Sequence, residues 1–148
     1  MYGDTQVIRR LAGQMREQGQ DLRLECRTLM ASVESVQWTG KASEAMRLHM
    51  KDTAAKLTQT AQDHEDAAEA LLAHAVEVDR LKALIAEIEH KAMSLVAGAE
   101  NRLRSLADQA VDLVKAVPNG VDAMLAAFNP PPSGNKAWLD VDLPGLHL

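Results

Sequence analysis

The sequence predicts an all-α protein whose main feature is an antiparallel helical hairpin. Proline is absent before Pro118, and Gly98 is the one glycine between residues 41 and 117, so long helices are favoured over loops. The aromatic residues are two tryptophans, one tyrosine and one phenylalanine, beside abundant Ala, Leu, Met and Val. This composition packs helix against helix better than sheet against sheet.

The first helix is expected over about residues 5–36, with Asp4 or Thr5 as its N-cap. Its apolar residues recur at alternating steps of three and four, apart from one skipped step around Gln18 and Gly19. We expect this stripe to face the second helix. It consists of Ile8, Leu11, Met15, Leu22, Cys26, Leu29, Val33 and Val36.

Trp38, Thr39 and Gly40 mark the point where the chain is expected to turn back, over residues 37–40. Glycine adopts backbone conformations that other residues resist, and an indole can close the end of a two-helix hairpin. Two helices cover such an indole only in part, so its free edge can serve as a recognition surface. Trp38 and Gly40 are therefore the predicted recognition turn.

The second helix is expected over about residues 41–117, with a candidate bend near Gly98. Two successive apolar steps of four, from Ile88 to Ala92 to Val96, form a stutter next to this glycine. A stutter locally unwinds a supercoil, which is why the bend is placed there.

A short helix is expected over 118–128, followed by a Pro-rich linker and a tail over 129–148. From Ala137 onward the tail alternates apolar and acidic residues, which is typical of a strand, but it has no second strand to pair with. We expect it to be disordered alone or docked on another surface.

The lengths of the two predicted helices imply a partner. The first helix spans roughly 48 Å and the second roughly 115 Å. A hairpin that turns at Trp38 leaves the second helix uncovered beyond about residue 75, which would forgo about 1.5 to 3 kcal/mol for each bulky aliphatic side chain left in water. The predicted pairing surface consists of Val78, Leu81, Ile85, Ile88, Leu95, Leu103, Leu106 and Leu113.

Three coverings of this surface remain open. The chain bends near Gly98 and folds 100–117 back on 78–96, or a second copy pairs with it, or a different helical protein does. The sequence around Gly98 is a weaker turn signal than the one at Trp38, so we favour an intermolecular solution.

No catalytic, metal or cofactor site is predicted. Residues 64–68 begin like a zinc-protease helix, but Ala68 stands where the second histidine is required. His64 and His74 are about 15 Å apart on a helix, too far to share an ion. We interpret both as partly buried interface residues, with a pH-sensitive interface as the alternative. Cys26 is the single cysteine and is interpreted as a small core residue.

Charge and hydropathy patterning restrict the partners and the location. The chain has 16 Lys plus Arg against 21 Asp plus Glu, a formal charge of -5, which opposes binding to nucleic acid. The N-terminus lacks the pattern of a cleavable signal peptide, and no stretch reaches the roughly 18 apolar residues that span a bilayer. Export would therefore need a route independent of a signal peptide.

Residues 36–47, which read VQWTGKASEAMR, resemble the turn of the Trp-x-Gly (WXG) family of small helical-hairpin proteins exported by type VII (Esx-type) secretion systems. The resemblance covers about residues 5–95. It implies a secreted or cell-surface protein that travels folded as a homo- or heterodimer with another helical hairpin and meets the secretion ATPase. Related hairpins also form N-terminal delivery regions of larger secreted toxins.

The chain departs from the family pattern at two points. Family export signals often include Tyr-x-x-x-Asp/Glu after the second helix, and no tyrosine follows Tyr2. Either a partner supplies that element, or a looser candidate export element does. That candidate consists of Ile85, Glu89, Ala92 and Val96. The second departure is length, because residues 96–148 exceed a minimal hairpin.

The leading hypothesis is a non-enzymatic secretion-targeting or delivery module that pairs with another helical hairpin and uses no cofactor. The alternatives are a cytoplasmic coiled-coil adaptor, in which the turn is coincidental, and a membrane-active protein whose 78–117 stripe enters a bilayer.

Overall fold

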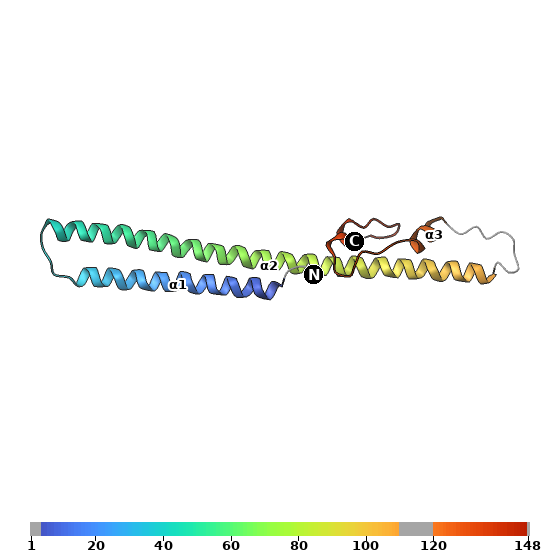
Figure 1. Ribbon diagram of the computed structural model, residues 1–148, viewed down its shortest axis with the longest axis horizontal. Helices are drawn as coiled ribbons and strands as arrows, with labels where there is room; N and C mark the ends of the chain where they lie inside the picture. Colours follow the sequence, from blue (N-terminus) through green and yellow to red (C-terminus); the bar gives the residue numbers. More distant parts are fainter. Residues whose placement is uncertain (1–3, 110–119, 148) are drawn as a thin grey trace. The chain divides into compact units, whose positions relative to one another are not determined.

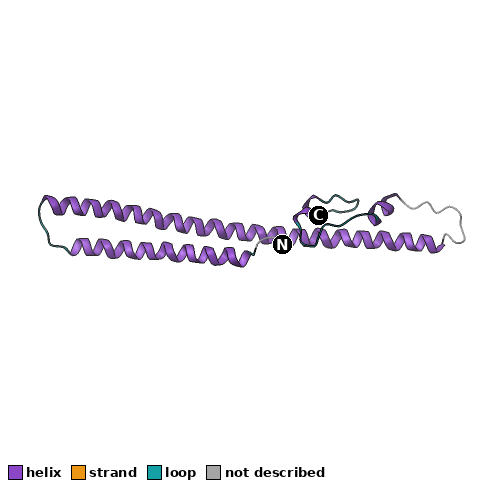
Figure 2. Ribbon diagram, in the orientation of Figure 1, coloured by secondary structure: helices purple, strands orange, loops and turns teal. Residues whose placement is uncertain are grey.

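The computed structural model describes residues 4–109 and 120–147. Its elements in chain order are α1 (Thr5–Ser35), α2 (Lys41–Gln109), α3 (Gly120–Ala126) and a 3-10 helix, η1 (Lys136–Asp140). No strand occurs within these two ranges, as Figure 2 illustrates. The predicted all-α class, with a long helix pair, is confirmed.

The chain divides into two compact units. The hairpin unit, Asp4–Glu77, contains α1 and the N-terminal part of α2. The tail unit begins at Val78 and contains the C-terminal part of α2 with α3 and η1. Each unit has buried residues of its own.

In the hairpin unit, α1 and α2 run side by side in opposite directions and are joined by the turn (Figure 1). Asp4 is the N-cap of α1, and its carboxylate accepts a hydrogen bond from the backbone N–H of Gln6 at 2.9 Å. This bond satisfies one of the donors that a helix start leaves without a partner. The helix ends at Ser35, close to the boundary that the sequence predicts.

The centre of the α1–α2 interface is a line of mostly small residues at seven-residue intervals. Buried members are Thr5, Ala12, Gly19, Cys26 and Val33 on α1, and Ala54, Ala61, Ala68 and Ala75 on α2. A Cβ atom added at Gly19 would lie 3.0 Å from the carbonyl oxygen of Ala61, and the Cys26 Sγ lies 3.4 Å from that of Ala54. The two backbones therefore approach closely, and these pairs set the antiparallel register.

Larger residues of the predicted stripe flank this line instead of forming its centre. Ile8, Met15, Leu22 and Leu29 are half-buried, and Leu11 is exposed. Ala12 and Gly19 do not stand out in the sequence, because their side chains are small and Gly19 looks like a skipped step of the apolar pattern. Both are buried, because small residues permit the closest helix contact.

Helix α2 continues through Gly98 without interruption. One of the three open coverings, the fold-back of 100–117 onto 78–96, is therefore wrong for residues 100–109, which belong to the same helix. The rest of that segment, Leu113 included, lies outside the described residues.

In the tail unit, the segment that contains α3 and η1 lies along α2 (Figure 1). Trp138 is 1% exposed, and its indole N–H donates a 3.0 Å hydrogen bond to the carbonyl oxygen of Pro132. Asn135 caps η1 by accepting from the N–H of Ala137 at 2.9 Å. The buried cluster joins the two parts of the unit and consists of Ile85, Ile88, Ala92, Ala99, Leu125, Trp138 and Leu143.

The tail is the covering that the sequence analysis did not consider. Ile85 and Ile88 are 1% and 4% exposed and lie in one cluster with tail residues, so in this structure the chain itself covers them. The tail was expected to be irregular, either disordered alone or docked on another surface. In the structure it forms η1 and an irregular chain, in which Trp138 and Leu143 are buried.

Candidate functional site

The turn presents Trp38 to solvent. This residue is 65% exposed, although it is one of the largest apolar side chains of the protein. Gly40 has a φ of +111°, a backbone conformation that residues with a side chain rarely adopt. A glycine is therefore required at this position for the chain reversal. The Gly40 carbonyl then accepts from the N–H groups of Ser43 and Glu44, both at 3.1 Å, at the start of α2.

Arg47 holds the backbone of the turn in place. Its Nη2 donates to the carbonyl oxygens of Val36 at 3.0 Å and Trp38 at 2.9 Å. Its Nη1 lies 3.4 Å from the hydroxyl oxygen of Ser43, and that hydroxyl donates to the Gly40 carbonyl at 2.8 Å. One guanidinium thus fixes the backbone of the turn, while the Trp38 side chain remains mostly exposed.

The role of Arg47 was not predicted from the sequence. The residue stands within the segment that carries the family resemblance, but a cation in the second turn of a helix is usually solvated. The available signal was its distance from Gly40, which is seven residues, or about two helical turns. A long side chain at that position can reach back to the carbonyl groups that a turn leaves without partners.

One flank of the hairpin unit is closed by an ion pair between the helices. Arg23 donates from Nε and Nη2 to the two carboxylate oxygens of Glu65, each at 2.8 Å, and from Nη2 to the Gln62 side chain, also at 2.8 Å. The hydrogen bond from Arg23, with its charge, lowers the pKa of Glu65. Glu65 is therefore paired across the interface between the helices.

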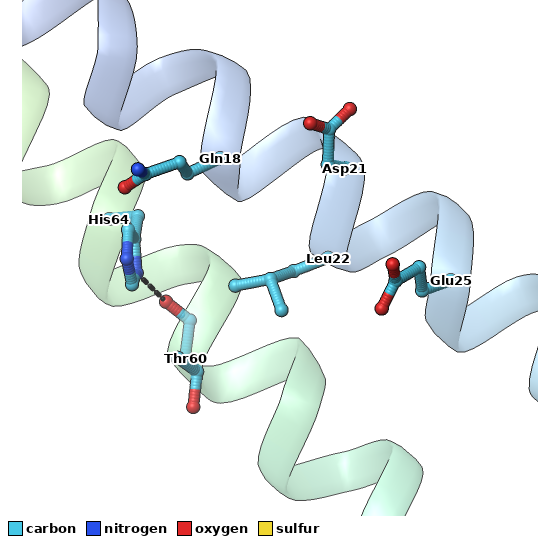
Figure 3. Close-up of a pocket in the computed structure, with 6 residues that line it drawn as sticks. All are labelled: Gln18, Asp21, Leu22, Glu25, Thr60 and His64. Atoms are coloured by element: carbon cyan, nitrogen blue, oxygen red, sulfur yellow. Dashed lines mark hydrogen bonds between the residues drawn. The ribbon is translucent and has the colours of Figure 1, made fainter.

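The other flank carries a shallow groove of about 410 Å³ (Figure 3). Its lining residues are Gln18, Asp21, Leu22, Glu25, Thr60 and His64. Leu22 projects between the helices, while Asp21 and Glu25 extend from α1. The His64 Nδ1 lies 2.8 Å from the carbonyl oxygen of Thr60 on its own helix, so this ring is engaged by backbone and not by a carboxylate.

The two histidines considered from the sequence differ in environment. His64 is half-buried beside the groove, whereas His74 is exposed. The expectation that His74 lies in the interface is wrong, because the buried line on α2 passes through Ala68 and Ala75. No group of three or more His, Cys, Asp or Glu side chains in the described ranges is arranged to hold a metal ion.

The candidate export element lies within the tail unit, and three of its four residues are buried. Ile85, Ala92 and Val96 are 1%, 0% and 9% exposed. Glu89 is half-buried, and its carboxylate accepts a 3.1 Å hydrogen bond from the N–H of Gly134 in the tail.

The rest of the predicted pairing surface is less covered than Ile85 and Ile88. Val78 is buried. Four leucines are half-buried, namely Leu81, Leu95, Leu103 and Leu106.

Comparison with known proteins identifies no relative: no family model, curated protein or solved structure matches this chain. Among the described helices, none combines the length and apolar character needed to cross a membrane.

Proposed function

We propose that this protein is a non-enzymatic secretion-targeting or delivery module of the type VII class, which pairs with another helical-hairpin protein. The observation that carries this proposal is the geometry of the turn. The Trp38 side chain is 65% exposed in the turn that connects two long antiparallel helices. Gly40 and Arg47 fix the backbone of this turn.

The physical basis is that rigid presentation favours binding. An exposed tryptophan that becomes buried in a partner's pocket contributes much of the affinity of a small interface. Because Arg47 already fixes the backbone of residues 36 and 38, less conformational entropy is lost when the indole binds. The turn then acts as the contact for the secretion machinery, and export follows a route that needs no signal peptide.

The helical partner would use the pairing surface on α2. Four of its leucines are only half-buried, including Leu95 and Leu103. Ile85 and Ile88 lie beneath the tail, so a partner helix reaches them when the tail moves aside. The partner that binds this surface is either a second copy of the chain or a different helical-hairpin protein.

The test is export of the full chain from a host that carries a type VII system, co-expressed with the product of the neighbouring gene. Trp38→Ala should reduce the exported fraction strongly, while Trp38→Phe should retain part of it because the phenyl ring still fills an apolar pocket. Leu48→Ala is the matched control, since Leu48 is 72% exposed on the same unit but lies outside the turn. If Trp38→Ala remains folded by circular dichroism and is exported at the normal level, the proposal is wrong.

A further inference from the structure

The tail packs on part of the α2 surface that is predicted to bind a partner. The buried cluster of the tail unit includes Ile85 and Ile88 from the pairing surface, and Ala92 from the candidate export element. The remaining polar member of that element, Glu89, binds the backbone N–H of Gly134. The protein therefore places its own chain where the proposed partner would bind.

The apolar part of the tail is concentrated around one side chain. Trp138 is 1% exposed and lies in the same cluster as Ala92 and Ala99, which are fully buried. Phe128 packs against it with the ring centroids 6.2 Å apart and a tilt of 57°. Small residues on a helix leave room for a large side chain to approach, so the α2 face accepts an indole where a helix partner would insert its own apolar residues.

The polar contacts of the tail differ in exposure: those of Glu89 and Lys91 are exposed, whereas the carboxylate of Asp122 is buried. The Arg102 side chain, 57% exposed, binds the carboxylate of Asp122 at 2.6 Å. The Lys91 ammonium donates to the carbonyl oxygen of His147 at 3.2 Å and also pairs with Glu87 at 2.8 Å. The exposed Lys91 contacts contribute little, whereas the Arg102–Asp122 pair is bidentate and its carboxylate is buried. The tail is therefore held by the apolar cluster together with this ion pair. A small cluster formed on a single helix belongs to the low-stability elements that open locally.

We infer that the segment 120–147 is a displaceable intramolecular cover, which holds the pairing surface and the export element of α2 closed until a helical partner replaces it. The inference rests on the proposed function, because it names the regulation of the same surface. In the closed state Ile85, Ile88 and Ala92 are inaccessible, and the exposed turn at Trp38 is presented alone. In the open state both recognition elements are available together.

The first test asks whether the α2 face is a docking site that can be emptied and refilled. The probe is a fluorescent synthetic peptide of residues 120–147, titrated into full-length chains. Wild type should not bind it, since its own tail occupies the face, and neither should Leu139→Ala, because Leu139 is 37% exposed. Trp138→Ala should bind the peptide, and adding Ile88→Asp to that variant should abolish binding. A Trp138→Ala chain that retains the hairpin by circular dichroism and binds no peptide overturns the inference.

The second test measures export of the same full-length variants. Trp138→Ala should raise the exported fraction severalfold over wild type, and Leu139→Ala should leave it unchanged. If Trp38→Ala still blocks export, unchanged or reduced export of Trp138→Ala overturns the inference that the tail is a displaceable cover. Normal export of Trp38→Ala instead removes the proposed function, while peptide binding to the α2 face is judged independently by the first test.

Discussion

At the scale of single residues, Gly19 decides how closely the helices of the hairpin approach. A Cβ atom at this position would lie 3.0 Å from the carbonyl oxygen of Ala61 and 3.1 Å from Cγ of Glu65. The first of these is backbone and cannot move without shifting α2. Gly13, on the same helix, has open space around the position of a Cβ atom.

This contrast predicts opposite effects for the same substitution. Gly13→Ala should raise the free energy of unfolding by about 0.5–1 kcal/mol, because alanine is the better helix former. Gly19→Ala should lower it, since the added methyl group overpacks the interface at a cost of about 1–3 kcal/mol, which exceeds the same helix gain. Urea denaturation followed by circular dichroism measures both. Equal stabilisation by the two substitutions would contradict the close approach.

The residues that form the site were predictable in part. Trp38 and Gly40 could be identified because a glycine and an aromatic residue interrupt an otherwise helical pattern. The role of Arg47 could not, because it depends on where the carbonyl groups of residues 36 and 38 point in space. Likewise, the pairing of Glu65 with Arg23 follows from the register of two helices and not from neighbours along the sequence.

At the scale of elements, α3 is attached to α2 through a carboxylate that responds to pH. The hydrogen bond from Arg102, with its charge, lowers the pKa of Asp122 from its ordinary value of 3.8. A carboxyl group with a lowered pKa stabilises the folded form above its ordinary pKa, and this contribution is lost as the pH falls through the lowered value. The contact should therefore be fully present at neutral pH and lost in acid.

We predict that the docked tail weakens as the pH falls below about 5 and that the change is complete only below the lowered pKa of Asp122. Trp138 fluorescence in a Trp38→Phe chain reports docking. Asp122→Asn should remove most of the acid dependence and shift the tail toward the open form at neutral pH. Asp142→Asn, which alters an exposed carboxylate in the same segment, serves as the control. If the acid response persists unchanged in Asp122→Asn, groups other than Asp122 cause it.

The helices themselves were predictable at this scale, whereas the tail was not. The boundaries of α1 and the start of α2 follow from a cap, a glycine and apolar spacing, which are local signals. The fold of the tail depends on Trp138, which is buried among α2 residues about forty to fifty positions earlier in the sequence. Local alternation suggested a strand because it carries no information on such distant neighbours.

At the scale of the whole molecule, the chain consists of two compact units that share α2. The hairpin unit is held by the small-residue line and the tail unit by the cluster around Trp138. Because each has its own buried residues, unfolding need not be a single two-state step.

We therefore predict that a destabilising substitution in one unit leaves the other unit largely folded. Trp138→Ala removes a fully buried indole, a change that typically costs about 3–5 kcal/mol, so amide protection in 120–147 should be lost. Protection in α1 should change little. Hydrogen exchange followed by mass spectrometry resolves the two segments, and loss of protection in both to the same extent would show that the units unfold together.

The sequence by itself determined the helical class, the position of the turn and the span of the first helix. These properties follow from local preferences, namely the absence of proline, the spacing of apolar residues and the conformational freedom of glycine. The tertiary structure decided which face of each helix is interior, because close packing favours Ala and Gly over larger residues that look more hydrophobic. It also decided that the uncovered stretch of α2 is covered by the chain's own tail, since burial depends on contacts between segments distant in sequence.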